Sequence, residues 1–330
     1  MVTVIIPTLE GGENLERCLA ALAAQTCADF ETIVVDNSGR GVARALAAEA
    51  GARSIQNPAN LGFGAAVNQG IDAARGEFLC TLNDDAFPDP HWLDQLAGAA
   101  RQDPSIGMFA SQIRLTETPD KLDSAGMAIY LDGSSKQRGR MALAAAYDAS
   151  EEVLFPSACA ALYRRDMLDQ VGPFDPDFFL YCEDTDLGLR GRRAGWGCLY
   201  VPAAVVYHRY SASAGRASGA KAFFVERNRL YTVVKNFPLW IWPLVPLFSC
   251  YRYLFHLWGA LTGQGLGAQS EPWWKLAIIV FSANFQVLRR LPALLASRRA
   301  IARSAALSSR DFWRLLRRHA LSAREVALQP

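Results

Sequence analysis

Short apolar runs alternate with amphipathic stretches over residues 1–110 of the 330-residue chain. The runs have the length of buried strands, and the amphipathic stretches carry apolar side chains at helical spacing. The predicted strands are Val2–Ile6, Thr32–Val35, Phe78–Leu82 and, with a weaker pattern, Arg53–Gln56. The predicted helices are Leu15–Ala24, Val42–Ala50, Gly64–Ala74 and Trp92–Arg101. This order predicts an α/β fold with a mostly parallel central sheet flanked by helices.

Polar side chains follow each of the predicted strands, in the segments Pro7–Glu10, Asp36–Ser38, Asn57–Asn60 and Asn83–Asp85. Ligands of open α/β sheets bind beyond the carboxyl ends of the strands, so we expect the four segments to meet at one crevice. From residue 105 to about residue 235 the pattern is mixed. There we expect a helix near Asp184–Ala194 and a polar, mobile loop at Gly133–Arg140.

The composition changes at Pro238. Two uncharged runs, Pro238–Tyr251 and Leu276–Leu288, have 14 and 13 residues. Both are shorter than the ~20 apolar residues that span a bilayer. Arginines at helical spacing follow, between apolar side chains such as Leu291 and Leu294, and the pattern recurs around Phe312–Leu316. Basic amphipathic helices of this kind lie in the headgroup layer of a membrane.

The charge distribution supports this interpretation. Residues 289–330 hold ten arginines against Asp311 and Glu325, a net charge of +8. Because the whole chain carries +2, residues 1–288 carry −6. We therefore expect residues 237–330 to associate with an anionic membrane surface. A spanning helix, a folded appendage and a dimer interface are the alternatives, and the sequence leaves a homo-oligomer open. The basic residues form no nucleic-acid-binding motif, so no nucleic-acid partner is expected.

The seven cysteines are scattered, without a Cys-x-x-Cys pair, which is typical of free thiols in a reducing compartment. The first residues are typical of a strand rather than a signal peptide.

Two acidic clusters are candidates for chemistry. Asn83-Asp84-Asp85 ends an apolar strand, where carboxylates can hold a divalent metal that also bridges a diphosphate, although the same residues suit a turn. The second cluster, Glu183, Asp184 and Asp186, begins a predicted helix. Acids there complement the helix dipole, but three in four residues exceed what one cap requires. A carboxylate with a raised pKa in such a cluster is a candidate general base.

Two further features are weaker. His208 ends the apolar run Ala204–Tyr207, and a lone histidine there is more often structural than a ligand. The segment Asn60–Val67 begins like a dinucleotide-binding glycine motif, but Val67 occupies the position of the third glycine. An NAD-dependent oxidoreductase is therefore disfavoured, although glycines ahead of a helix still allow close approach of a phosphate or ribose.

In their order and spacing, these segments resemble family 2 glycosyltransferases of the GT-A fold, particularly rhamnosyltransferase-like members. The resemblance covers residues 2–236 and rests on Val4–Thr8, Ile33–Ser38, Asn60–Gly64, Leu82–Asp85, Gly172–Asp175, Phe178–Leu187 and Tyr207–His208. It implies that residues 1–236 form the catalytic domain, with a nucleotide-binding half at 1–110 and an acceptor and catalytic half at 111–236. Residues 237–330 form the hydrophobic and basic helical region.

The resemblance also implies roles for single residues. Thr8 and Glu10 would lie beside the nucleotide, Asp36 would contact the pyrimidine base, and Asn60 and Gly62 would shape the nucleotide pocket. Asn83-Asp84-Asp85 matches the family's Asp-x-Asp element, in which Asp84 lies near the ribose or diphosphate and Asp85 binds the metal. His208 would complete the metal site, and Asp184 would be the catalytic base. Asn83 replaces the first acid of that element, and Ala158 replaces a glycine that the family often has on the acceptor side.

By this resemblance, the chain is an inverting, Mn²⁺- or Mg²⁺-dependent glycosyltransferase that uses a UDP- or dTDP-sugar, with rhamnose as the first expectation. The acceptor would be a hydroxyl of a glycan or a polyprenyl-linked glycan in cell-surface polysaccharide synthesis. The enzyme would be cytoplasmic and peripheral on the inner face of the cytoplasmic membrane. The alternative is a non-catalytic, membrane-associated protein that binds nucleotide sugars.

Overall fold

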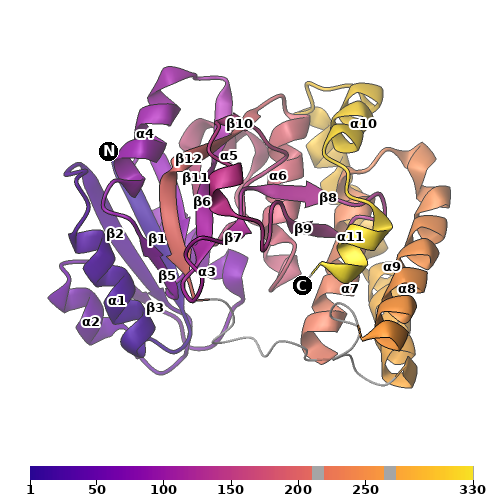
Figure 1. Cartoon of the computed structure of the whole chain (residues 1–330), viewed down its shortest axis with the longest axis horizontal. Helices are drawn as coiled ribbons and strands as arrows, with labels where there is room; N and C mark the ends of the chain where they lie inside the picture. Colours follow the sequence, from indigo (N-terminus) through magenta and orange to yellow (C-terminus); the bar gives the residue numbers. More distant parts are fainter. Residues whose placement is uncertain (210–218, 264–272, 330) are drawn as a thin grey trace.

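In the computed structural model, a large mixed sheet forms the centre of the chain (Figure 1). The structure describes residues 1–209, 219–263 and 273–329. Its strands are β1 (Val2–Thr8), β2 (Phe30–Asp36), β3 (Arg53–Gln56), β4 (Phe78–Leu82), β5 (Ala86–Pro88), β6 (Ile106–Leu115), β7 (Leu122–Ser124), β8 (Met127–Ile129), β9 (Ser135–Gln137), β10 (Glu151–Glu152), β11 (Ala160–Arg164) and β12 (Gly197–His208).

Helices cover this sheet and extend beyond one end of it. The α-helices are α1 (Gly12–Ala23), α2 (Arg44–Glu49), α3 (Phe63–Ala73), α4 (Trp92–Gln102), α5 (Arg165–Val171), α6 (Glu183–Arg193), α7 (Gly219–Asn236), α8 (Val245–Thr262), α9 (Trp273–Arg303), α10 (Ser309–Arg318) and α11 (Ala323–Leu328). Three short 3₁₀ helices are η1 (Ala144–Ala146), η2 (Pro176–Phe178) and η3 (Leu239–Leu244). The predicted helices and strands of residues 1–110 are all present, with bounds shifted by at most a few residues.

The order of strands in the main sheet is β10-β12-β6-β11-β4-β1-β2-β3. The run β4-β1-β2-β3 is parallel, as predicted, whereas β11 is inserted antiparallel between β4 and β6. Strand β12 runs parallel to β6, and its end also pairs with β5. The carboxyl ends of β1, β2 and β4 therefore lie at one edge, together with the end of β12.

Two apolar cores lie on opposite faces of the sheet, because alternate side chains of each strand point to opposite faces. Val4 and Ile6 of β1 pack with Leu15 of α1 and Trp92 of α4. Ile5, between them in sequence, belongs to the other core together with Val67 of α3, Leu187 of α6 and Phe155. This burial on both faces agrees with the near-continuous apolar pattern of β1 and β4.

The prediction of a mobile loop at Gly133–Arg140 is wrong. Ser135–Gln137 form β9, which pairs with β8 in a separate two-stranded sheet. The preceding turn is fixed by Asp132, which is fully buried and accepts hydrogen bonds from Ser134 N and from Arg252 Nε of α8. The segment is therefore held by strand pairing and by the buried Asp132 rather than left mobile in solvent.

The described residues after 236, at 237–263 and 273–329, form helices that pack against the rest of the chain through one side. Helix α9 packs on α7, where Leu294 is buried with Tyr231 and Val234. Within the described residues, α9 is the one helix with the length and apolar composition to cross a membrane, and these two properties alone define it as a candidate. The candidate span is Trp274–Arg303, and an 18-residue window within it has a mean hydropathy of 1.3.

The expectation that Phe312–Leu316 face a membrane is wrong. Phe312, Leu315 and Leu316 of α10 are buried in the same apolar core as Ile5 and Phe155. The apolar side of this helix therefore packs on the part of the chain that contains the central sheet, and its arginines face outward. Two of the arginines of α9 also bind protein: Arg290 pairs with Asp177, and Arg298 donates to the carbonyl oxygens of Val234 and Phe237. The division of the chain at residue 236 stays a prediction.

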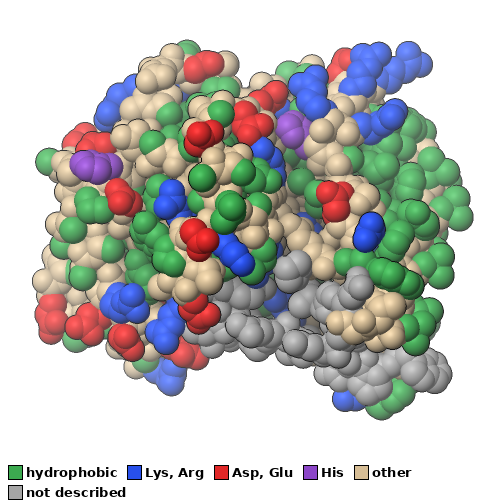
Figure 2. Space-filling view, viewed as in Figure 1, with side chains coloured by type: hydrophobic (Ala, Val, Ile, Leu, Met, Phe, Trp, Pro, Cys, Tyr) green, Lys and Arg blue, Asp and Glu red, His purple; other side chains and the backbone are tan. Residues whose placement is uncertain are grey.

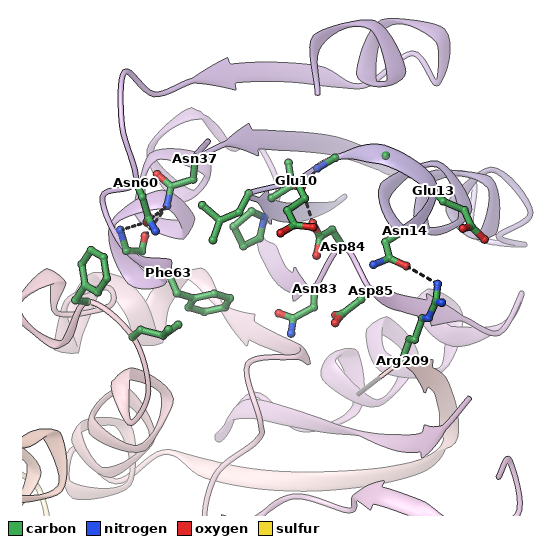
Figure 3. Close-up of a pocket in the computed structure, with 18 residues that line it drawn as sticks. Glu10, Glu13, Asn14, Asn37, Asn60, Phe63, Asn83, Asp84, Asp85 and Arg209 are labelled. Atoms are coloured by element: carbon green, nitrogen blue, oxygen red, sulfur yellow. Dashed lines mark hydrogen bonds between the residues drawn. The ribbon is translucent and has the colours of Figure 1, made fainter. Parts of the chain in front are cut away.

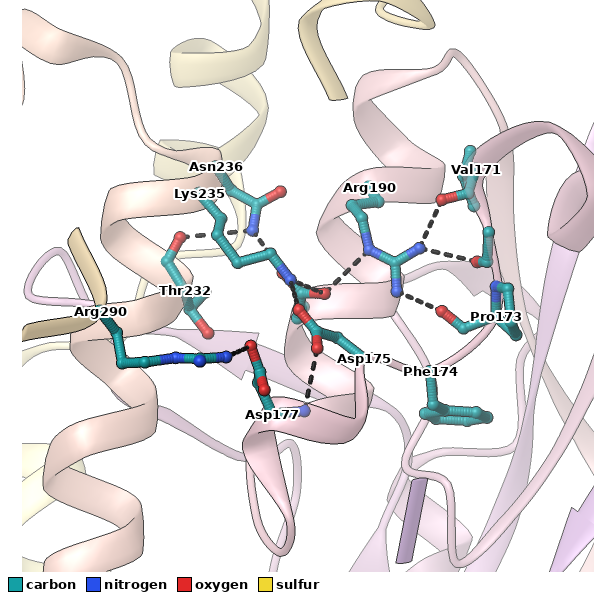
Figure 4. Close-up of polar contacts among 12 residues, drawn as sticks. Val171, Pro173, Phe174, Asp175, Asp177, Arg190, Thr232, Lys235, Asn236 and Arg290 are labelled. Carbon is teal, nitrogen blue, oxygen red and sulfur yellow. Dashed lines mark hydrogen bonds and ion pairs between the residues drawn. The ribbon is translucent and has the colours of Figure 1, made fainter. Parts of the chain in front are cut away.

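A network of buried charges joins α6, α7 and the loop before η2 (Figure 4). The Asp186 carboxylate is fully buried and accepts hydrogen bonds from Arg190 Nε, Lys235 Nζ and Asn236 Nδ2. Lys235 also pairs with Asp175, at 2.6 Å. Burial raises the pKa of Asp186, but Lys235 and Arg190 outweigh it and hold the pKa at about 2.

We predict that Lys235→Met lowers the free energy of unfolding by about 3 to 5 kcal/mol, because removing one partner leaves charge uncompensated in the buried network. Urea unfolding followed by circular dichroism measures this loss. The control is Arg314→Met, which breaks the exposed 2.7 Å ion pair with Asp311 and should cost less than about 1 kcal/mol. Equal losses in the two variants would show that the buried network is not a major source of stability.

Candidate active site

A cavity of about 360 Å³ lies at the carboxyl ends of β1, β2 and β4. Seven of the predicted site residues line it: Thr8, Glu10, Asn60, Gly62, Asn83, Asp84 and Asp85. Figure 3 shows Asn83, Asp84 and Asp85 beside Glu10, with Asn37 and Asn60 at the other end of the cavity. The expected convergence of the polar strand ends is thus observed. Of the described residues predicted for the site, Asp36, Asp184 and His208 lie outside the cavity wall.

The acidic end of the cavity is built by the turn after β4. Thr8 Oγ1 donates to Asp84 Oδ2 at 2.5 Å and accepts from Gly11 N at 3.0 Å, which fixes the turn against the end of β1. Burial raises the pKa of Asp84 to about 6, with further contributions from the charges of Asp85 and Glu10. Crowded, buried carboxylates of this kind are stabilised by a cation.

Asp85 and His208 are brought together by the pairing of β5 with β12, in which His208 lies opposite Ala86. His208 Nε2 lies 3.3 Å from Asp85 Oδ1, and His208 Nδ1 lies 2.8 Å from Asp123 Oδ2. All three side chains are buried. Burial opposes a charge on His208, but Cys159, Asp123 and Asp85 raise its pKa well above the ordinary value.

Asp85 and His208 form a donor set that fits a divalent metal. A metal-binding histidine usually donates its other ring N–H to a carboxylate, which orients the ring, and Asp123 occupies that position. The described residues form no preassembled group of three or more histidine, cysteine, aspartate or glutamate ligands. A metal bound here would therefore take its remaining ligands from the donor diphosphate and from water.

The asparagine end of the cavity is a network of amide side chains. Asn37 Nδ2 donates to Asn60 Oδ1 at 3.0 Å and to the carbonyl of Gly62 at 3.1 Å. Gly62 has φ +89°, and a Cβ there would lie 2.4 Å from the carbonyl oxygen of Phe179. The absence of a side chain at Gly62 therefore allows close packing against the Phe179 segment, which also lines the cavity.

Asp36 caps the turn that follows β2. Its carboxylate accepts hydrogen bonds from Ser38 N, Ser38 Oγ and Ala43 N. Burial raises the pKa of Asp36, but these hydrogen bonds outweigh it and lower the pKa below the ordinary value. The neighbouring Asn37, rather than Asp36, lines the cavity, and contact of Asp36 with a base stays a prediction.

Asp184 lies at the start of α6, behind the turn that contains Ala158. Its Oδ2 accepts a 3.4 Å hydrogen bond from Ala158 N, and its Oδ1 accepts a 2.7 Å hydrogen bond from Thr185 N. The next residue, Cys159, accepts a hydrogen bond through its carbonyl from Asn83 N at 2.8 Å. One turn thus connects Asp184 to the acidic end of the cavity.

Glu183 and Asp184 differ in their hydrogen bonding. Burial, together with the charge of Asp184, raises the pKa of Glu183 to about 8. Burial also raises the pKa of Asp184, against the opposing hydrogen bonds from Ala158 and Thr185. Within the described residues, Glu183 Oε2 has no hydrogen-bond partner. Burial therefore favours the neutral form of Glu183, whereas the hydrogen bonds from Ala158 and Thr185 support the carboxylate form of Asp184.

The loop before α6 has a strained backbone. Phe179, Tyr181 and Cys182 have φ of 62°, 69° and 65°, which is unusual for residues other than glycine. Asn228 of α7 is fully buried and donates through Nδ2 to the carbonyls of Phe178, Leu180 and Tyr181. This contact, which the sequence did not predict, holds the loop that carries Asp184.

Arg209 is a second residue that sequence reasoning missed. It lines the cavity and donates through its side chain to Asn14 Oδ1 at 3.3 Å and through its backbone to the carbonyl of Asp85 at 2.9 Å. Figure 3 shows it opposite the acidic turn. The sequence does contain a signal for this residue: Arg209 directly follows His208, which the resemblance assigns to the metal site.

Comparison with known proteins identifies the family. The family model for glycosyl transferase family 2 matches residues 3–172. An N-acetylglucosaminyl-diphospho-decaprenol L-rhamnosyltransferase of Mycobacterium tuberculosis is 33% identical over 245 residues, covering 66% of this chain and 78% of that protein. A PGL/p-HBAD biosynthesis glycosyltransferase of Mycobacterium bovis is 35% identical over 103 residues, covering 29% of this chain and 40% of that protein.

Two solved structures share the fold. GalNAc-T7 with UDP, GalNAc and Mn²⁺ has a TM-score of 0.58 at 16% identity, and the match covers 71% of this chain and about half (48%) of that one. The mannosyltransferase PcManGT of Pyrobaculum calidifontis, with GDP-Man and Mn²⁺, has a TM-score of 0.51 at 18% identity. The match covers 92% of this chain and 85% of that one. The GT-A fold expected from the sequence is confirmed. The chain belongs to glycosyl transferase family 2 and is a glycosyltransferase.

Proposed function

We propose that the chain is an inverting, metal-dependent enzyme that transfers rhamnose from a UDP- or dTDP-sugar to a hydroxyl of a polyprenyl-linked glycan. The observation that supports this most is the combination of the Asp85–His208 pair, 3.3 Å apart at the cavity, with Asp184 behind the adjoining turn. The name of the Mycobacterium tuberculosis relative gives L-rhamnose as the sugar and a decaprenyl diphosphate derivative as the acceptor. Synthesis of a cell-surface polysaccharide is the corresponding process.

In this proposal the cavity between Asn60 and Asp85 holds the nucleoside diphosphate. Asn37 and Asn60 form the end that accepts the base and ribose, whereas Arg209 faces the diphosphate. Asp85 and His208 would hold Mn²⁺ or Mg²⁺, which would supply positive charge beside the leaving diphosphate. The guanidinium of Arg209 stabilises the same developing charge from the other side.

Asp184 acts as the general base in this mechanism. The hydrogen bonds from Ala158 N and Thr185 N orient its carboxylate. It takes the proton from the acceptor hydroxyl while that oxygen attacks the anomeric carbon and the bond to the diphosphate breaks. A single displacement inverts the anomeric configuration, so no covalent enzyme nucleophile is needed. A raised pKa brings such a base closer to the operating pH.

We predict that Asp184→Asn lowers kcat by about 10²- to 10⁴-fold, because the amide cannot accept the proton. Radiolabelled sugar transfer to a lipid-linked acceptor measures the loss, and calorimetry with the nucleotide checks that donor binding persists.

The matched variant is Glu183→Gln. Because the pKa of Glu183 is about 8, its carboxyl is mainly neutral at pH 7, and the glutamine amide imitates that neutral group. Its loss of turnover at pH 7 should be far smaller. The reverse ranking would make Glu183 the base, and full transfer by Asp184→Asn would remove Asp184 from the mechanism. Absence of both transfer and donor hydrolysis in the wild type would support a non-catalytic binding protein instead.

We predict that Asp85→Ala and His208→Ala each reduce the enhancement by Mn²⁺ of UDP or dTDP binding by tenfold or more, because each removes a metal ligand. Binding of uridine or thymidine should change little, since these residues lie at the acidic end of the cavity. Isothermal titration calorimetry with and without the metal measures both effects. His91→Ala is the control, because His91 is exposed at the start of α4 and does not line the cavity. Full metal enhancement in either variant would exclude that residue as a ligand.

We also propose that the enzyme lies on the cytoplasmic face of a membrane through α8 and the first half of α9. Both helices expose apolar stripes at helical spacing, and Figure 2 shows hydrophobic side chains gathered on this side of the molecule. The stripe of α8 consists of Leu247, Tyr251, Leu254, Leu257, Trp258 and Leu261; that of α9 consists of Trp274, Ile278, Phe281, Phe285 and Leu288. Stripes of this size mark interaction surfaces, and a lipid-linked acceptor makes a membrane the matching partner.

We predict that Leu254→Gln combined with Phe281→Gln moves the protein from the pellet to the supernatant when it is sedimented with anionic liposomes. These side chains are 62% and 73% exposed, so the changes leave the core intact. Arg314→Gln, on the exposed side of α10, is the control and should have little effect. High salt should release only part of the wild type, because salt screens charge but not apolar insertion. Unchanged sedimentation of the double variant would exclude the stripes as the membrane surface.

A further inference from the structure

A group of cations lies outside the cavity described above, where β9, α7 and α8 meet. Lys136 of β9 is partly buried, and the charges of Arg140, Lys221 and Arg252 all act on it. His256, one turn after Arg252 on α8, lies 3.4 Å from that arginine, Nε2 to Nη1. We call Lys136, Arg140, Lys221 and Arg252 the cationic cluster.

Two arginines of the cationic cluster are paired with acids that the structure describes. Arg252 is paired with Asp132 at 2.7 Å and with Glu226 at 3.1 Å, and Arg140 is paired with Asp123. The side chain of Lys136 makes no hydrogen bond or ion pair with any residue that the structure describes, whereas its backbone pairs with Ala128 of β8. Burial and the surrounding cations lower the pKa of Lys136 to about 8. At neutral pH its ammonium group therefore remains mainly charged, in surroundings that favour an added anion.

The cationic cluster adjoins the proposed catalytic base. Ser135 precedes Lys136 in sequence, and its Oγ lies 2.7 Å from Oγ1 of Thr185. Thr185 directly follows Asp184. Lys221 Nζ lies 5.5 Å from the centre of the Tyr181 ring, in the strained loop that leads to Asp184. Two separate contacts thus connect the cluster to the segment that carries the base.

The other side of the cationic cluster is formed by α8. Arg252 is 7% exposed and faces inward, whereas Tyr251 and Leu254 beside it in sequence are 55% and 62% exposed. One helix therefore presents cations toward the protein and an apolar stripe toward the outside. An anion bound at the cluster would lie between the proposed base and the proposed membrane surface.

We propose that the cationic cluster binds the diphosphate of a polyprenyl-diphosphate acceptor, with the polyprenyl chain leaving along the apolar stripe of α8. This inference rests on the proposed function and specifies how the acceptor is held. A diphosphate presents several anionic oxygens to several cations, and Lys136 supplies a charge that no described residue neutralises. The position of the cluster sets the sugar, which is joined to that diphosphate, toward Asp184. The headgroup of an anionic phospholipid offers related chemistry, and the test separates the two.

The first experiment measures binding of farnesyl diphosphate to the full-length protein in detergent micelles. EDTA and saturating UDP are present, so that the donor cavity is occupied and no metal bridges the probe. We expect Lys136→Gln to weaken farnesyl diphosphate binding by about tenfold or more, the usual effect of removing a charge-assisted hydrogen bond. Lys121→Gln, a change of the same kind at a lysine outside the cluster, should leave the affinity unchanged.

Two further probes identify the anion. Farnesol, which lacks the diphosphate, should bind weakly and equally to the wild type and Lys136→Gln. Vesicles of anionic phospholipid should bind equally to both proteins. If Lys136→Gln lost vesicle binding but kept farnesyl diphosphate binding, the cluster would be a headgroup site and the proposal would be wrong. Equal farnesyl diphosphate affinity of all three proteins would also overturn it.

A kinetic experiment separates this inference from the proposed function. For the diphosphate-linked acceptor, Lys136→Gln should raise KM by about tenfold or more, while KM for the donor and the slow hydrolysis of the donor stay unchanged. For a neutral alkyl glycoside with the same acceptor sugar, the wild type and the variant should be alike. Loss of transfer to both acceptors would contradict the diphosphate role. An inactive wild type would instead refute the proposed function, and the binding experiment would still decide the role of the cluster.

Discussion

The position of the candidate base depends on buried charge compensation between α6 and α7. Asp186 lies half a turn after Asp184 on α6, and its fully buried carboxylate is neutralised by Lys235 and Arg190. An isolated carboxylate could not be buried there, so α6 can occupy this place only when α7 is packed against it. Asn228 of the same helix supplies the missing donors for the strained loop before Asp184. Helix α7 is thus the element that holds the segment carrying Asp184 in place.

Strand pairing determines the positions of Asp85 and His208. His208 and Asp85 are 123 residues apart in sequence, yet the register of β5 on β12 places them side by side. Asp123, from β7, then fixes the imidazole from the opposite side. The donor set is consequently part of the sheet, where backbone hydrogen bonds limit its movement, rather than part of an exposed loop. A rigid pair of this kind would suit the proposed cation, whose other ligands would arrive with the substrate.

The sequence predicted the fold of residues 1–110 well, because the strands and helices there follow regular periods and polar residues follow the strands. It also predicted that Asn83-Asp84-Asp85 would join Thr8, Glu10 and Asn60 at one cavity. The contributions of Asn228, Asp123 and Lys136 could not be predicted, since each depends on contacts between segments far apart in sequence. The predictions of a mobile loop at Gly133–Arg140 and of a membrane-facing segment at Phe312–Leu316 were wrong for the same reason. Local polarity does not reveal whether a charged or amphipathic segment faces solvent, lipid or another part of the protein.

The docking of α10 has a consequence for biosynthesis. Phe312, Leu315 and Leu316 complete the apolar core that also contains Ile5, and Leu321 N donates to the carbonyl of Ile129 at 2.8 Å. Because these residues follow α8 and α9 in the chain, a ribosome releases the apolar helices before the catalytic core can close. The helices can thus reach a bilayer while the enzyme is still incomplete. Maturation of the active site would then take place at the membrane surface, close to the lipid that the enzyme is proposed to glycosylate.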